Sequence, residues 1–222
     1  MHIKENILNY KAELPPDVAL VAVSKTKPVS DLMEAYDAGQ RIFGENKIQE
    51  MADKYVQMPK DIQWHMIGHV QTNKVKFMAP FVSLIHGVDS LKLLEEIDKH
   101  AQKNQRTIDC LLQIYIAAEE SKFGFDENEL DELLSSASFA NLKNVQVKGL
   151  MGMATFTENE EQVKNEFEKL KSIYDRLKVS NTAFSILSMG MSGDYKLAIE
   201  CGSTMVRIGS SIFGERKLKV DN

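Results

Sequence analysis

A single lysine stands where an apolar run gives way to a polar turn. Residues 18–23 are continuously apolar and rich in valine, which is typical of a strand buried on both faces, and Lys25 follows soon after. A lysine that is partly desolvated at the mouth of a site can lose its proton and form an imine with an aldehyde. The alternative interpretation is a solvated lysine that merely ends the strand.

Two turns rich in serine and glycine, residues 188–192 and 209–211, offer a site for a phosphate group. Glycine lets backbone N–H groups approach an anion, and serine hydroxyls add hydrogen-bond donors. Ordinary turn chemistry accounts for the same residue types. Combined with an imine-forming lysine, a phosphate site indicates a phosphorylated aldehyde as the ligand. Both pyridoxal 5′-phosphate and a sugar phosphate in a Schiff-base aldolase fit that description.

The residue that bears on this choice is Arg207, which lies in the expected last strand, residues 205–208, just before the second turn. If Arg207 points into the site, it is a permanent cation beside the ring of any cofactor there. A pyridine nitrogen that faces it stays unprotonated and accepts a hydrogen bond, which weakens the cofactor as an electron sink. The alternative is a surface arginine paired with Glu200 or Glu215.

The hydropathy pattern supplies a scaffold that brings these distant residues together. An opening helix with Ile3, Ile7, Tyr10 and Leu14 on one face stops at two prolines, and eight short apolar runs then alternate with segments of helical spacing. The expected strands are residues 18–23, 41–44, 62–67, 81–85, 107–116, 145–151, 184–187 and 205–208. The expected helices are residues 29–38, 47–56, 71–78, 91–101, 127–135, 160–178 and 195–200, with a short helix in the tail.

This alternation predicts a (β/α)₈ TIM barrel with an extra N-terminal helix, formed as a single domain by residues 1–222. The alternative architecture is an open doubly wound sheet. In a barrel of this type, active sites lie at the carboxyl ends of the strands. Lys25, Arg207 and both turns are expected at those ends.

Composition and charge limit the classes of partner. The chain is 43% hydrophobic and 27% charged, so it can bury an ordinary core. Its 27 basic and 32 acidic residues give a net charge of −5, and we expect no binding to nucleic acid or to membranes. Cys110 and Cys201 lie far apart without metal-ligand spacing, and no signal peptide is evident. We therefore expect a cytoplasmic protein with free thiols and no bound metal.

The motifs around the candidate residues occur in a fixed order along nearly the whole chain. They are VAVSKTKP at 21–28, FGEN at 43–46, WHMIG at 64–68, QTNK at 71–74, SKFG at 121–124, GLM at 149–151, LSMGMS at 187–192 and GSTMVRIG at 202–209. This set resembles the pyridoxal phosphate homeostasis proteins (the YggS/PROSC family). The motifs are too long and too well ordered to match by chance.

The resemblance implies a single barrel like the N-terminal domain of bacterial alanine racemase, among the fold-type III pyridoxal enzymes. It implies that Lys25 carries pyridoxal 5′-phosphate as an internal aldimine and that Arg207 faces the pyridine nitrogen. Gly209 and Ser210 are implied to hold the phosphate. The residue types alone had pointed to Lys25, Arg207 and the two turns.

Asn46 and His65 rest on the resemblance alone, which places Asn46 near the ring. Ser188 lies in the first of the two turns, and the resemblance adds it to the phosphate contacts. Two departures are visible, because His69 stands where we expect proline and Ser210 where we expect threonine. Serine keeps the hydroxyl, so phosphate binding should survive. His69 is either an extra proton carrier near the mouth or a solvated loop histidine.

Three functions fit these residues, and the resemblance favours a carrier. Such a protein binds pyridoxal phosphate reversibly and buffers it or delivers it to apo-enzymes, with no robust catalytic activity. An amino-acid racemase of low activity is the alternative, but it needs a second acid/base, which in the similar racemases is a tyrosine from another domain across a dimer. We expect no such domain in 222 residues, and hence a monomer. A class I aldolase would instead trap sugar phosphates and lack yellow colour.

Overall fold

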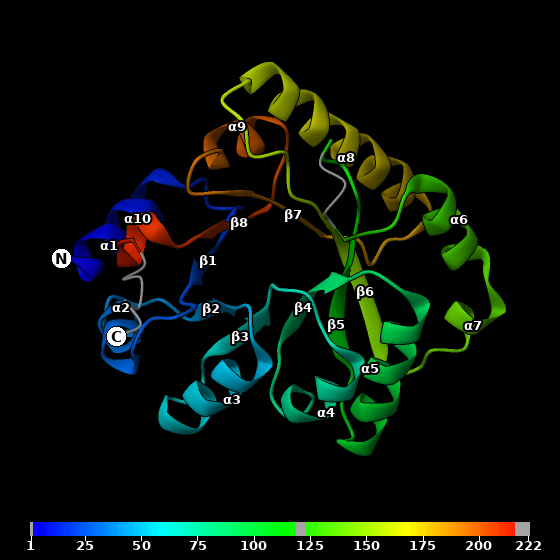
Figure 1. Cartoon of the computed structure of the whole chain (residues 1–222), viewed down its shortest axis with the longest axis horizontal. Helices are drawn as coiled ribbons and strands as arrows, with labels where there is room; N and C mark the ends of the chain where they lie inside the picture. The colour runs from blue at the N-terminus through cyan, green and yellow to red at the C-terminus, as the bar shows by residue number, and fades with distance from the viewer. Residues whose placement is uncertain (1, 119–122, 216–222) are drawn as a thin grey trace, which may run out of the picture.

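The computed structural model describes residues 2–118 and 123–215. Eight parallel strands pair in chain order, and the last returns to the first, so that the sheet closes into a barrel (Figure 1). The predicted (β/α)₈ barrel is confirmed, and the open doubly wound sheet is wrong. The strands are β1 Ala19–Val23, β2 Ile42–Glu45, β3 Gln63–Met66, β4 Leu84–Val88, β5 Ile108–Gln113, β6 Val145–Met151, β7 Ile186–Met191 and β8 Met205–Ile208.

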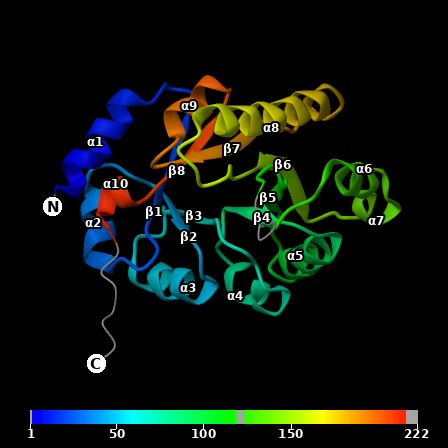
Figure 2. The same cartoon turned by 45° about the horizontal axis from the view of Figure 1, so that its top comes forward.

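Helices surround the strands, as both views of the molecule show (Figures 1 and 2). The extra N-terminal helix is present as α1, and it packs beside α2 and α10. The helices are α1 Ile3–Glu13, α2 Val29–Asp37, α3 Ile48–Gln57, the 3₁₀ turn η1 Thr72–Lys74, α4 Val75–Met78, α5 Leu91–Lys103, α6 Glu127–Ser135, α7 Ala137–Ala140, α8 Glu160–Ser180, α9 Tyr195–Glu200 and α10 Ser210–Phe213.

Two strands begin later than the apolar runs predict. Phe81 and Val82 both donate their backbone N–H to the Met78 carbonyl, so they close the turn after α4 and β4 starts only at Leu84. Phe184 likewise closes the turn after α8 through the Asn181 carbonyl. Apolar residues that pack beneath a turn are hard to distinguish from strand residues by hydropathy. Strand β7 also extends to Met191. Residues 188–191 are therefore strand residues, and the prediction that they form a turn is wrong.

Alternation along the strands separates an outer and an inner layer. Outward side chains such as Ala22 and Phe43 join the main core beneath the helices. Inward side chains form a small apolar cluster that includes Val21, Leu84, Leu111, Met151 and Met205. Nearer the carboxyl ends of the strands, inward positions become polar, and these buried side chains are His65, His86, Ser188 and Arg207.

Three other features of the described residues can be read directly. In the described ranges, no helix is both long and apolar enough to span a bilayer. Cys110 is fully buried, which raises the pKa of its thiol, and neither Cys110 nor Cys201 forms a disulfide. No group of metal-ligating side chains comes together among the residues that the structure describes.

Candidate functional site

Lys25 lies directly beyond β1, at the carboxyl end of the barrel. The Ser24 N–H still bonds the Gly44 carbonyl at 3.0 Å, so the ladder with β2 continues up to the residue before Lys25. Val21 lies inside the barrel, and the two-residue period of the strand puts Lys25 on the same inner side. Ser24 is fully buried and Lys25 is half-buried. The structure thus places Lys25 where the apolar strand opens into the mouth, as the sequence predicts.

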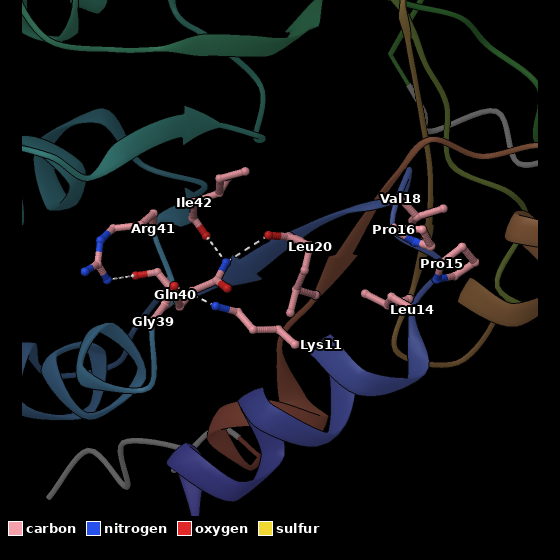
Figure 3. Close-up of a pocket in the computed structure, with 10 residues that line it drawn as sticks. All are labelled: Lys11, Leu14, Pro15, Pro16, Val18, Leu20, Gly39, Gln40, Arg41 and Ile42. Atoms are coloured by element: carbon pink, nitrogen blue, oxygen red, sulfur yellow. Dashed lines mark hydrogen bonds between the residues drawn. The ribbon is translucent and has the colours of Figure 1, made fainter.

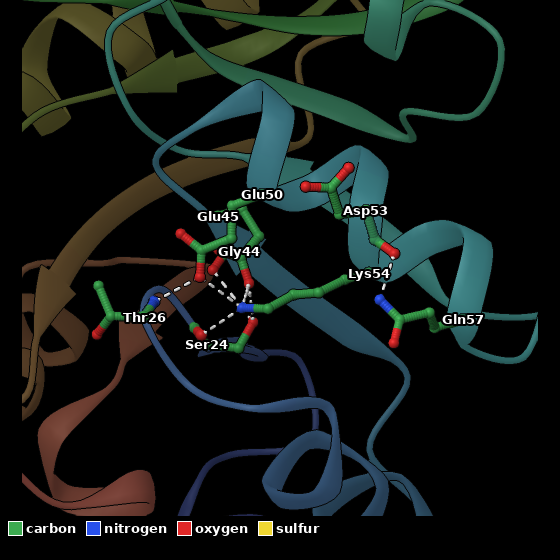
Figure 4. Close-up of polar contacts among 8 residues, drawn as sticks. All are labelled: Ser24, Thr26, Gly44, Glu45, Glu50, Asp53, Lys54 and Gln57. Carbon is green, nitrogen blue, oxygen red and sulfur yellow. Dashed lines mark hydrogen bonds and ion pairs between the residues drawn. The ribbon is translucent and has the colours of Figure 1, made fainter.

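A buried ionic cluster holds the residue before Lys25 (Figure 4). Lys54 on α3 donates from Nζ to the Ser24 carbonyl at 2.8 Å and to Oε1 of both Glu45 and Glu50 at 2.7 Å. The Ser24 hydroxyl donates to Glu45 Oε1 at 2.6 Å. Because the side chain of Lys54 is 7% exposed and that of Glu45 is 0% exposed, this cluster is a rigid buried anchor for the turn.

Burial shifts the pKa of one carboxyl in this cluster. Desolvation raises the pKa of the Glu45 carboxyl, and Lys54 and Ser24 oppose that shift. Oε2 of Glu45 is buried without a hydrogen-bond partner. Loss of the Lys54 charge would therefore destabilise the cluster, because an unpaired buried carboxylate is costly.

The residues after Lys25 are held as firmly. The Thr26 N–H donates to Glu50 Oε1 at 2.6 Å, and Thr26 has φ 65°, in the left-handed region that non-glycine residues rarely adopt. Lys27 reaches the opposite way and donates from Nζ to the carbonyls of Phe213 and Gly214, both at 2.9 Å. The turn that carries Lys25 is thereby tied both to α3 and to the end of α10, a degree of fixation typical of functional turns.

The predicted turn at residues 209–211 begins against the end of β1. Gly209 precedes α10, and an added Cβ at Gly209 would come 3.2 Å from both Cβ and the carbonyl oxygen of Val23. The Gly209 N–H donates to Ser192 Oγ at 3.3 Å, so the segment after β7 meets the segment after β8. Gly209 is half-buried and Ser210 is exposed. The first-turn N–H groups of a helix lack acceptors within it, which suits this position to an anion.

Arg207 points into the barrel, and the alternative of a surface arginine is wrong. It pairs in register with Val21 of β1 and is 4% exposed. Its Nη1 donates to Ser188 Oγ at 2.6 Å and its Nη2 to the Gly152 carbonyl at 3.1 Å. Desolvation lowers the pKa of the guanidinium to about 10, so Arg207 remains cationic at neutral pH.

Ser188 is placed differently from the sequence prediction. It is fully buried within β7, and its hydroxyl contacts Arg207 and, at 3.0 Å, Nδ1 of His86. The prediction assigned it to an open turn because serine and glycine are turn formers. In the structure, Ser188 instead occupies an inward-facing position of strand β7. These contacts indicate that Ser188 supports Arg207 rather than binding a phosphate.

Asn46 and His69 lie on the β2 and β3 side of the mouth. Asn46 directly follows β2 and is half-buried. At Gly68, an added Cβ would come 2.6 Å from the Asn46 carbonyl oxygen, so glycine allows the two loops to pack together. His69 is exposed, with Nδ1 3.2 Å from Asp89 Oδ2 and its ring stacked on Phe123. Ser121 and Lys122 of the SKFG motif lie outside the described residues.

Sequence reasoning missed several residues that support this site. Glu45, Glu50 and Lys54 had no assigned role, although an acidic residue that ends an apolar strand signals a buried partner. His86 was likewise given no role. Its even spacing from Leu84 was the available signal, because that spacing puts both side chains inside the barrel.

A hollow of about 300 Å³ lies at the other end of the barrel (Figure 3). It is lined by the segments before β1 and β2, where Lys11 donates to the Gly39 carbonyl at 2.6 Å and Gln40 to the Leu20 carbonyl at 2.8 Å. Because these segments precede the strands, the hollow opens at the amino ends and is separate from the site around Lys25.

The chain is similar to curated proteins over most of its length. Residues 1–217 match the family model described as the alanine racemase N-terminal domain. The chain is 43% identical over 200 residues to the pyridoxal phosphate homeostasis protein of Aquifex aeolicus, an alignment that covers 89% of this chain and 87% of that protein. It is 38% identical over 209 residues to the protein of the same name from Escherichia coli, with coverages of 91% and 87%.

Solved structures share the fold. PipY of Synechococcus elongatus without PLP is 34% identical with a TM-score of 0.89, covering 96% of this chain and 100% of that one. PipY with PLP bound gives a TM-score of 0.86 with the same coverage. An alanine racemase of Clostridium difficile gives 0.76 at 15% identity, covering 98% of this chain and 57% of the racemase, a likeness that shows the fold alone.

Proposed function

The chain belongs to the pyridoxal phosphate homeostasis protein family, and from that premise we propose that it binds pyridoxal 5′-phosphate reversibly as a Schiff base on Lys25. The observation that carries the proposal is the placement of Lys25 just after β1 and of Arg207 on the adjacent β8, at one end of the barrel, beside the start of α10. The structure of PipY with PLP bound supports the same ligand class.

The residues present fit the cofactor in their chemistry. Lys25 provides a half-buried amine at the mouth of the barrel. Arg207 provides a buried cation that is a donor only, which suits an unprotonated pyridine nitrogen. At Gly209 a side chain would crowd Val23, so glycine lets the start of α10 pack against the end of β1. We propose that the first backbone N–H groups of α10 bind the phosphate. We propose Ser210 as a hydroxyl donor to that phosphate and Asn46 as a neighbour of the ring.

Each residue then has one task. When bound, pyridoxal phosphate supplies an aldehyde that condenses with an amine, and one water leaves. Lys25 would supply that amine, and hydrolysis would free it again. The ties from Thr26 to Glu50 and from Lys27 to α10 keep the Lys25 backbone in place while the bond forms and breaks. Arg207 and the α10 backbone bind the far ends of the ligand and orient it toward Lys25.

We propose a carrier rather than an enzyme. The relatives that match along most of the chain are named for homeostasis of pyridoxal phosphate, not for a reaction. On this proposal the protein buffers the cofactor in the cytoplasm and delivers it to apo-enzymes, acting as a monomer. Racemisation of an amino acid would need a second acid/base opposite Lys25.

The proposal is tested by absorbance titration of the purified protein with pyridoxal phosphate. We expect a yellow band typical of a protonated Schiff base in the wild type and its loss in Lys25→Ala. Lys47→Ala is the matched control, because Lys47 is an exposed lysine that precedes α3. A Lys25→Ala protein that keeps the band would contradict the assignment of the Schiff base to Lys25. Racemisation of alanine or serine by the pure wild type would contradict the carrier proposal.

A further inference from the structure

Four polar side chains form a continuous hydrogen-bonded chain across the inside of the barrel. Arg207 on β8 contacts Ser188 on β7, and Ser188 Oγ lies 3.0 Å from Nδ1 of His86 on β4. Nε2 of His86 then lies 3.0 Å from Nδ1 of His65 on β3. All four residues are between 0% and 4% exposed. Because β7 and β4 are not neighbours in the sheet, the contact between Ser188 and His86 bridges the lumen.

The order of protons along this chain follows from its partners. Arg207 has only donors, so Ser188 Oγ accepts from it. Among the described residues, the only other partner of that buried hydroxyl is Nδ1 of His86, which must therefore accept the Ser188 proton. His86 then carries its proton on Nε2 and donates it to Nδ1 of His65. Both imidazoles are neutral in this arrangement.

The hydrogen-bonded side chains orient a cation that has no carboxylate in contact among the described residues. Within the described part of the molecule, Arg207 is held by Ser188 Oγ and the Gly152 carbonyl and by no carboxylate, and Asp194 acts on it only at longer range. A buried cation paired with a carboxylate would have its donors and its charge saturated. Neutral acceptors orient the guanidinium and leave its remaining N–H groups and its charge available.

We propose that Ser188, His86 and His65 are positioning residues, which hold Arg207 with neutral acceptors so that the guanidinium can bind the pyridine nitrogen of the cofactor. This inference rests on the function proposed above. Burial also lowers the pKa of both histidines, that of His65 to about 3, which keeps the imidazoles neutral and the proton order unchanged at physiological pH.

The test compares the absorbance spectrum and the rate of pyridoxal phosphate release on dilution among folded variants. We expect Ser188→Ala and His86→Leu to shift the absorbance band and to release the cofactor at least about tenfold faster, as befits the loss of a hydrogen bond to a charged group. His86→Asn, which keeps a polar partner for Ser188, should release it at close to the wild-type rate. Lys25 remains in all of these variants.

Ser203→Ala is the matched control. Ser203 is another buried serine in this part of the barrel, but its hydroxyl bonds backbone carbonyls, including that of Met189 at 2.7 Å. We expect a lower thermal midpoint and an unchanged band and release rate. Wild-type band and release rate in both Ser188→Ala and His86→Leu would overturn the inference. A wild type without any band would instead overturn the proposed function.

The proton order also has a test in the unmodified protein. Nitrogen NMR of the imidazoles distinguishes the two tautomers of a neutral histidine. We expect His86 and His65 each to carry the proton on Nε2. A proton on Nδ1 of His86, or a charged His86 at neutral pH, would overturn the inference even if the variants failed to fold.

Discussion

The two sides of the barrel mouth hold their buried cations in opposite ways. On the β1 and β2 side, Lys54 has three acceptors, two of which are carboxylate oxygens of Glu45 and Glu50. On the β7 and β8 side, Arg207 has a serine hydroxyl and a backbone carbonyl. Lys54 is paired with two carboxylates and is therefore structural, whereas Arg207 has only neutral hydrogen-bond partners among the described residues, which suits it to a ligand.

This difference shows which side of the mouth is held rigid and which side is suited to bind a ligand. The ionic cluster fixes the backbone of the turn around Lys25, because Lys54 bonds the Ser24 carbonyl and Glu50 bonds the Thr26 N–H. The neutral chain inside the barrel fixes only the head of one side chain, that of Arg207. The first arrangement should dominate the free energy of unfolding, and the second should dominate the response to ligand and pH.

The largest effect is expected from Lys54→Met. This change leaves two carboxylates close together, one of them fully buried, and should lower the free energy of unfolding by about 3–5 kcal/mol. Chemical denaturation at neutral pH measures it. Lys164→Met is the control, because Lys164 pairs with Glu168 on an exposed face of α8 and its loss should matter little. Equal losses of stability in the two variants would show that the buried ionic cluster around Lys54 stabilises the fold no more than a surface ion pair does.

The next effect is a dependence of stability on pH. The pKa of His65 is about 3 in the folded protein, below the ordinary value of 6.5, so below pH 6.5 the unfolded chain binds a proton that the folded chain does not. This histidine should therefore lower the free energy of unfolding by about 1.4 kcal/mol for each pH unit between 6.5 and 3. The difference between wild type and His65→Leu, measured by denaturation from pH 7 down to 4.5, should show that slope.

The control for that slope is His69→Leu, which removes an exposed histidine at the same end of the barrel. If His69→Leu and His65→Leu change the pH dependence equally, the burial of a neutral imidazole is not its cause. Glu45 contributes in the opposite direction, because its pKa is raised and its protonated form is favoured as the pH falls. Comparing each variant with wild type cancels that contribution.

A smaller effect is expected from Arg207→Met in the protein without ligand. Because no carboxylate contacts Arg207 among the described residues, its removal leaves no orphaned charge. We expect a free energy of unfolding within about 1 kcal/mol of wild type, or above it. The same variant should bind pyridoxal phosphate much more weakly by absorbance titration. A loss of stability as large as that of Lys54→Met would erase the contrast between the two cations.

The smallest effect is expected from Thr26→Gly. Glycine accepts the left-handed backbone at this position without strain, but it also adds freedom to the unfolded chain. The free energy of unfolding should rise by no more than about 1 kcal/mol. If the strained turn serves to present Lys25, the rate of Schiff-base formation should fall although stability does not. An unchanged rate would show that the ionic cluster alone is sufficient.

Much of the fold could be predicted because both faces of every strand in this barrel are covered. Such strands read as continuous apolar runs, and α8 shows its buried stripe of Val163, Phe167, Leu170 and Tyr174 plainly. Strand ends were less certain where apolar residues pack under turns, as at Phe81 and Phe184. The helix α7 was not predicted, since one turn has too short a period to detect.

Within the site, residue type and position predicted Lys25 and Arg207 but not what holds them. Glu45 and Lys54 meet because β2 packs against α3, and nothing in their separation along the chain reveals it. His86 and Ser188 meet across the lumen of a closed barrel, from strands that are far apart in sequence. Such contacts depend on closure and register, which hydropathy does not encode.

The central claim is that Lys25 is the residue that holds the cofactor. The most direct measurement is borohydride reduction of the wild-type protein loaded with pyridoxal phosphate, followed by peptide mass mapping. The account predicts a pyridoxyl group fixed on Lys25. Modification of another lysine in preference to Lys25, or no stable modification after reduction, would contradict it.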